Sequence, residues 1–146
     1  MKKFLRATAV FSALLVLASL VAASPSNGDV RFVFDDWSGP SLPVHLFVPD
    51  GADADTPIVI VMHGASREAE RYYNDWRAEA ERYGFVVVVP YFSREDFPKS
   101  AHYNLGHVFD RETGAPRPAG SWTFAAIEPL FDVVVARLGG SQAQYT

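Results

Sequence analysis

The fold is decided by residues 57–90, which read PIVIVMHGASREAERYYNDWRAEAERYGFVVVVP. An apolar, β-branched run at 57–62 opens this stretch, and a second at 85–89 closes it. Such runs are typical of strands that are covered on both faces in a parallel sheet. Small and aromatic residues between them recur at steps of three and four, which predicts an amphipathic helix over 66–83. Strand, helix and strand of these lengths predict a βαβ unit with a right-handed crossover.

The predicted helix has recognisable ends and one apolar stripe. Ser66 is the expected N-cap, and Gly84 is expected to end the helix. The stripe consists of Ala69, Tyr72, Tyr73, Trp76, Ala80 and Tyr83.

The segments on either side extend this unit. Two short β-rich runs at 31–34 and 44–48 predict an antiparallel opening pair. Residues 93–120 are rich in proline, glycine and charge, and a loop of that length is usually functional or mobile. A second helix is expected over at least Pro129–Leu138, with a start as early as Ser121 left open, and residues 141–146 resemble the approach to another strand.

Residues 1–23 have the pattern of a secretory signal peptide. A basic head is followed by an apolar run at 7–23 and by small residues before the expected cleavage after Ala23. The alternative is an uncleaved membrane anchor, although the run is barely long enough to span a hydrocarbon core of about 30 Å. No cysteine follows the cut, which excludes a lipid-anchored lipoprotein.

Composition limits the function of the remaining domain, residues 24–146. The full chain has 146 residues, no cysteine and a net charge of −4. Removal of 1–23 leaves ten cations against seventeen acids, a net charge of −7. An acidic domain repels anionic polymers, so no nucleic-acid partner is expected, and neither is a membrane partner after cleavage. The predicted location is secreted or periplasmic.

One motif points to chemistry. The string Val61-Met62-His63-Gly64-Ala65-Ser66 joins the apolar strand to the helix. With the strings at 83–90, 103–106 and 124–130, it resembles the α/β-hydrolase fold, and within that fold the secreted esterases related to polyhydroxyalkanoate depolymerases. The resemblance covers about all of 30–146. It implies an α/β chain that forms the N-terminal half of such a hydrolase: antiparallel opening strands, then βαβ in a mostly parallel sheet.

The resemblance also implies roles for single residues. The backbone N–H of Ala65 would enter the oxyanion hole, and His63 and Gly64 would shape the turn. Ser66, Tyr103 and Asn104 are the residues expected to contact substrate. No cofactor and no metal are implied.

The sequence departs from the family at the nucleophile. No Gly-x-Ser-x-Gly occurs in the 146 residues, and the nearest string, at 64–68, lacks the second glycine. The resemblance therefore implies a chain that is truncated before the nucleophile elbow and lacks nucleophile, acid and base. The first hypothesis is a carboxylic ester hydrolase, acting on a small-molecule or polymeric ester when completed. The alternative is a non-catalytic truncated product that acts at most as a secreted binding or interaction module. A flavodoxin-like domain is disfavoured because no phosphate-binding glycine loop follows a strand.

Other reactive residues have simpler interpretations. Ser66 is better explained as a helix cap than as a nucleophile, and His63 as a structural residue than as a base. A zinc site would have to use loop residues whose geometry nothing fixes: His102, His107 and Asp110. A calcium loop at 50–55 lacks the required glycine and glutamate.

The strand at 57–62 is a predicted site of self-association. The usual sheet order of the family places it between the fourth and fifth strands, and the fifth strand is expected to begin only near Thr146. Its outer edge would then be apolar and unpaired, and such edges pair with other chains.

Overall fold

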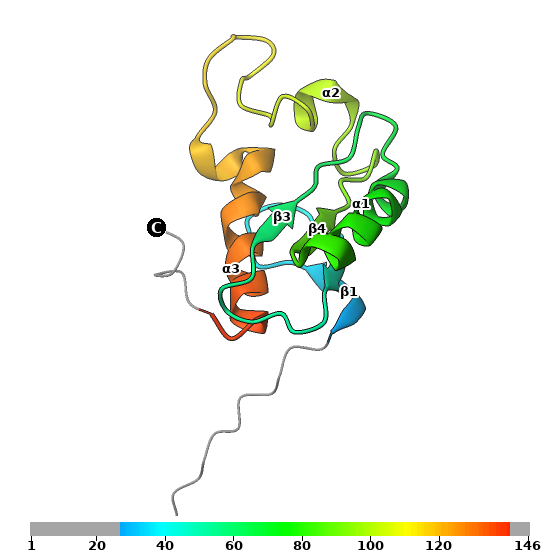
Figure 1. Cartoon of the computed structure of the whole chain (residues 1–146). Helices are drawn as coiled ribbons and strands as arrows, with labels where there is room; N and C mark the ends of the chain where they lie inside the picture. Colours follow the sequence, from blue (N-terminus) through cyan, green and yellow to red (C-terminus); the bar gives the residue numbers. More distant parts are fainter. Residues whose placement is uncertain (1–26, 141–146) are drawn as a thin grey trace, which may run out of the picture.

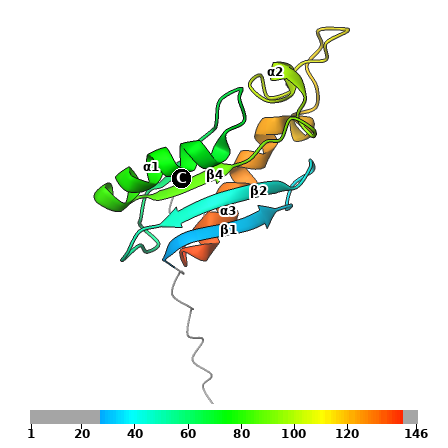
Figure 2. The ribbon, with the colours of Figure 1, turned by 90° about the vertical axis from the view of Figure 1, so that its right-hand side faces the viewer.

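A computed structural model describes residues 27–140. The predicted signal peptide at 1–23 and the predicted final strand at 141–146 lie outside this range. The described chain forms a single mixed sheet with one long helix on each face (Figures 1 and 2).

The sheet has four strands in the order β1-β2-β4-β3. β1 (Gly28–Phe34) and β2 (Leu42–Val48) form the predicted antiparallel opening pair, with Gly28 opposite Val48. β4 (Val86–Pro90) pairs antiparallel with β2 and parallel with β3 (Ile58–Ile60). The parallel pairing predicted for the βαβ unit is confirmed, and the sheet as a whole is mixed.

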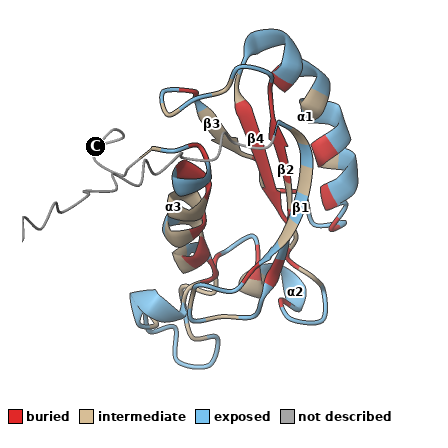
Figure 3. Cartoon of the chain, turned by 90° about the horizontal axis from the view of Figure 1, so that it is seen from below, coloured by how far each residue is buried: buried red, intermediate tan, exposed pale blue. Residues whose placement is uncertain are grey.

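The two helices cover opposite faces of the sheet, as Figure 3 shows from below. α1 (Ala69–Tyr83) packs on one face, where Val87 and Val89 of β4 contact Phe47 of β2. α3 (Ile127–Arg137) packs on the other, against a larger cluster that contains Val86 and Val88. β4 is buried on both faces, and this burial explains why its sequence is a continuous run of valines.

Helix boundaries differ from the prediction at the start of α1. The helix begins at Ala69, three residues later than expected, because Arg67 adopts a left-handed backbone with φ of 66°. Glu68 is the N-cap residue and makes no side-chain capping bond, so the N-cap assignment of Ser66 was wrong. Gly84 ends the helix in the left-handed conformation, as predicted.

The stripe of α1 is only partly buried. Tyr73 packs into the core, whereas Trp76 and Tyr83 are 40% and 64% exposed. The second helix has Pro129 in its first turn, where proline is tolerated. Two short 3-10 turns precede it, at Ala119–Ser121 and Thr123–Ala126.

The long connection at 93–120 has little regular structure. It contains the single helical turn α2 (Lys99–His102) and an isolated bridge between Phe109 and Pro116. It lies beyond the end of β4 (Figure 2), and hydrogen bonds from Arg94 and Tyr103 join it to the segment that links β3 to α1.

Candidate active-site turn after strand β3

The segment that follows β3 is anchored by a buried histidine. His63 is 2% exposed, and both of its ring nitrogens are engaged. Nε2 accepts a hydrogen bond from Phe92 N–H at 3.0 Å, and Nδ1 lies 3.0 Å from Gly64 O, to which it donates. A ring that accepts at one nitrogen and donates at the other is neutral. Burial is the largest cause that lowers the pKa of His63, and the lowered pKa favours the neutral ring.

Tyr103 packs against this histidine and bonds to its backbone. Its side chain is 2% exposed, and its ring centroid lies 4.7 Å from that of His63. Its hydroxyl donates to His63 O at 2.5 Å, and burial raises the pKa of Tyr103 to about 12. The long loop is thereby attached to the turn. The substrate contact expected of Tyr103 stays a prediction. The hydroxyl that would make it already donates to His63 O.

The turn itself spans residues 64–67. Arg67 N–H donates to Gly64 O at 3.0 Å, which closes the turn and leaves Ala65 and Ser66 exposed at its tip. A Cβ on Gly64 would lie 2.9 Å from the Tyr72 hydroxyl, so glycine allows α1 to approach closely. Within residues 27–140 no acceptor contacts the Ala65 N–H, which leaves this donor available.

Two arginines that the sequence analysis did not single out hold the turn. Arg94 Nη2 donates to Ala65 O at 3.0 Å, and Arg67 Nη2 donates to Phe97 O at 2.8 Å. Both bonds tie the turn to residues 94–97 of the long loop. Nothing in the sequence signalled them, because neither belongs to a recognisable motif.

Ser66 has a carboxylate as its partner. Its hydroxyl donates to Glu68 Oε2 at 2.7 Å, and Glu68 also pairs with Arg71 at 3.4 Å. No histidine activates this serine, so the geometry gives it no role as a nucleophile. Asn104 is exposed beside Tyr103. The expected substrate contacts of Ser66 and Asn104 stay predictions.

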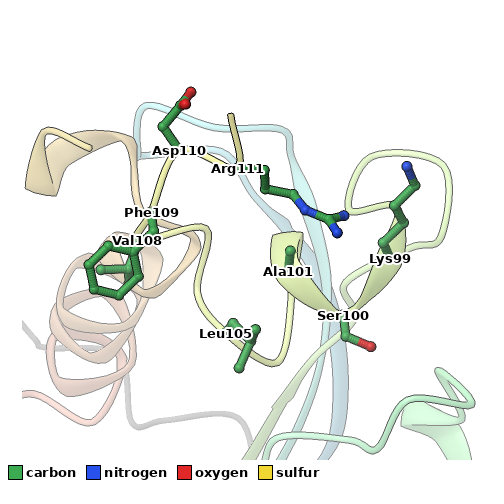
Figure 4. Close-up of a pocket in the computed structure, with 8 residues that line it drawn as sticks. All are labelled: Lys99, Ser100, Ala101, Leu105, Val108, Phe109, Asp110 and Arg111. Carbon is green, nitrogen blue, oxygen red and sulfur yellow. The ribbon is translucent and has the colours of Figure 1, made fainter. Parts of the chain in front are cut away.

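A cavity of about 490 Å³ lies in the long loop, beside α2 (Figure 4). Its lining consists of Lys99, Ser100, Ala101, Leu105, Val108, Phe109, Asp110 and Arg111. None of the residues predicted to contact substrate contributes to it. The cavity therefore gives no support to those contacts.

The histidine pair considered for zinc lines a different hollow from this cavity. The rings of His102 and His107 have centroids 4.2 Å apart, while the carboxylate of Asp110 accepts from Thr113. Among residues 27–140 no three histidine, aspartate or glutamate side chains are placed to hold a metal ion. None of the helices in that range combines the length and apolar character needed to cross a bilayer.

The mixed sheet, the crossover helix and the exposed turn after β3 match the α/β-hydrolase fold, and the chain is similar to parts of solved hydrolases of that type. It is similar to poly(aspartic acid) hydrolase-1 from Sphingomonas sp. KT-1, with 42% identity and a TM-score of 0.73 over 78% of this chain and 43% of that one. It is also similar to the poly(3-hydroxybutyrate) depolymerase LpqC from Bordetella parapertussis, with 28% identity and a TM-score of 0.68 over 79% of this chain and 40% of that one. The chain thus spans about two fifths of the length of either structure. No family model and no curated protein matches it.

Proposed function

We propose that this chain provides the oxyanion-binding half of a secreted serine hydrolase that cleaves carboxylic esters, including those of polymers. The observation that carries the proposal is the free Ala65 N–H at the tip of a turn that is fixed from three sides. His63 and Tyr103 hold it from within, and Arg94 holds its carbonyl. A fixed backbone donor of this kind is what acyl transfer requires.

The chemistry follows from the relation to the hydrolases. A serine hydroxyl from a Gly-x-Ser-x-Gly elbow attacks the ester carbonyl, and a histidine takes its proton. The carbonyl oxygen becomes negative, and Ala65 N–H donates to it. The alcohol then leaves with the proton, and water hydrolyses the acyl-enzyme. This chain supplies the donor, while nucleophile, acid and base come from sequence outside residues 1–146.

The proposed secreted or periplasmic location rests on the signal peptide predicted at 1–23. It is tested by expressing the full chain and determining the N-terminus of the exported product, which should be Ser24. A product retained in the membrane with its first 23 residues would support the anchor alternative.

A chimera tests the catalytic role. Residues 27–140 would replace the matching segment of poly(aspartic acid) hydrolase-1, whose sequence is similar enough for the exchange. We expect the chimera to hydrolyse short p-nitrophenyl esters. Ala65→Pro, which removes the N–H, should lower kcat by about 10²- to 10³-fold, the effect of losing one oxyanion donor.

The matched control is Ala65→Gly, which keeps the N–H and should keep kcat within about threefold of the parent, a difference below 1 kcal/mol. Circular dichroism checks that the proline variant is folded. Equal rates for the proline and glycine variants would place the donor elsewhere. Assays on poly(aspartic acid) and on poly(3-hydroxybutyrate) then distinguish the two polymer classes on which the related proteins act, according to their names.

A further inference from the structure

Arg67 is a buried cation without an acidic partner. Its side chain is 8% exposed, and it sits in a left-handed backbone that arginine rarely adopts. One of its nitrogens donates to Phe97 O, and its Cζ lies 4.0 Å from the centre of the Tyr103 ring. The other two nitrogens, Nε and Nη1, are buried and have no hydrogen-bond partner.

Among residues 27–140 no carboxylate oxygen lies within 4.0 Å of the Arg67 nitrogens. The ion pairs in that range all involve other arginines, on the exposed faces of α1 and β1. Burial is the main cause that lowers the pKa of Arg67, and the charge of Arg94 lowers it further. Arginine nevertheless stays protonated in proteins, so the positive charge is retained.

Such an arrangement is unfavourable for stability. An unpaired buried charge is strongly destabilising, and an apolar side chain of similar size is often better tolerated. One hydrogen bond to a carbonyl and stacking on a tyrosine recover only part of that cost. The position of the charge therefore needs another explanation.

We infer that Arg67 is a positioning residue of the proposed oxyanion site, whose uncompensated buried charge makes the potential at the Ala65 turn positive. This inference rests on the proposed function. Arg67 ends the turn of which Ala65 is the second residue, and Tyr103 links its guanidinium to the carbonyl of His63. Water screens a buried charge less than an exposed one, so the charge of Arg67 adds to that of the exposed Arg94 in favouring a negative oxygen at Ala65 N–H.

A single thiol reports this potential without any need for activity. The chain has no cysteine, so Ala65→Cys in the full chain introduces one thiol at the turn. The pH dependence of its alkylation by iodoacetamide gives its pKa, which should lie below the usual value of about 8.5. Adding Arg67→Met or Arg67→Gln should raise that pKa by about one unit, which slows alkylation about tenfold at pH 7.

Two control variants separate charge from packing. Arg67→Lys keeps the charge and should leave the thiol pKa within about 0.3 unit, whereas a purely structural role would make it behave like methionine. Arg71→Met removes an exposed cation on α1, which solvent screens, and should change nothing. Circular dichroism must show native secondary structure in each variant.

The inference is overturned if the neutral variants leave the thiol pKa unchanged, or if lysine and methionine shift it equally. These results are independent of the chimera. A catalytically silent chimera with the expected thiol shift would contradict the proposed function alone. An active chimera with no shift would contradict only the role of Arg67.

Discussion

At the scale of single residues, a small network of buried groups connects the turn to the rest of the molecule. His63 bonds to the backbone after β4 through Nε2, and Tyr103 bonds to the backbone of His63. Each contact joins segments about thirty to forty residues apart in the sequence. These bonds fix the backbone on which the exposed Ala65 lies.

This network predicts a loss of stability in mild acid. The pKa of His63 is lower in the folded chain than in the unfolded one, because burial disfavours the charged ring. The unfolded state therefore binds the proton more readily, and stability that is present above about pH 6.5 is lost as the pH falls through the folded pKa. Urea unfolding should give a lower free energy of unfolding at pH 5.5 than at pH 7.5.

The matched variant is His63→Gln, which cannot titrate. It should lower stability at pH 7.5 by about 1–3 kcal/mol, because a buried partner of Phe92 N–H is disturbed. The remaining pH dependence should be smaller than in the parent, since among the other histidines only His45 and His107 have lowered pKa values. An unchanged pH dependence would show that His63 does not titrate in this range.

Gly64 and Tyr72 should be coupled. Gly64→Ala puts a methyl group 2.9 Å from the Tyr72 hydroxyl, so the tyrosine must shift, and we expect a loss of about 1 kcal/mol in the free energy of unfolding. In a Tyr72→Phe background the same change should cost less, because the obstructing oxygen is gone. Thermal unfolding of the four proteins measures this coupling. Additive effects would mean that the glycine serves another purpose.

Residue identities at the turn were partly predictable. The His63-Gly64-Ala65 string was found from its place after an apolar strand, because strand and helix periods can be read locally. The left-handed conformation of Arg67 and the burial of its side chain were not predictable. The side chain of Arg67 contacts Phe97 and Tyr103, which are distant in sequence, and no local pattern predicts that they meet it.

At the scale of elements, β3 is an edge strand among the described residues. It pairs with β4 on one side, and Ile58 and Ile60 are only partly buried against the cluster under α3. An apolar, β-branched edge invites pairing with another chain. We expect residues 24–146 to self-associate through this edge in a concentration-dependent way.

A lysine on β3 tests this expectation. Ile58→Lys should shift size-exclusion elution toward the monomer, at a loss of about 1–3 kcal/mol in stability from the truncated apolar contact. The control is Val33→Lys on β1, at the opposite edge and 63% exposed, which should leave the elution unchanged. A parent protein that elutes as a compact monomer at every concentration would refute self-association.

The elements themselves were largely readable from the sequence. The opening hairpin, the valine strand and the two helices were predicted because each has a clear period and clear ends. The start of α1 was placed three residues too early, since the turn that precedes it also contains capping-type residues. The 3-10 turns before α3 depend on contacts such as Thr123 N–H with Gly106 O, which no local pattern reveals.

At the scale of the whole molecule, the described residues provide the Ala65 N–H as a hydrogen-bond donor for an oxyanion, and they provide no activated nucleophile. The isolated chain should therefore show no turnover of p-nitrophenyl esters above background, because triad members act as a unit. A serine-directed phosphonate should leave Ser66 unlabelled, since its partner is Glu68 and not a base. Labelling of Ser66 together with turnover would reverse the assignment of that residue.

The central claim is that Ala65 N–H receives the negative oxygen in the completed hydrolase. A crystal structure of the chimera, with its elbow serine labelled by a phosphonate, measures this directly. The account predicts a distance of about 2.7–3.1 Å between Ala65 N and the phosphonyl oxygen. A phosphonyl oxygen held by other donors, with Ala65 N beyond hydrogen-bonding distance, would contradict it.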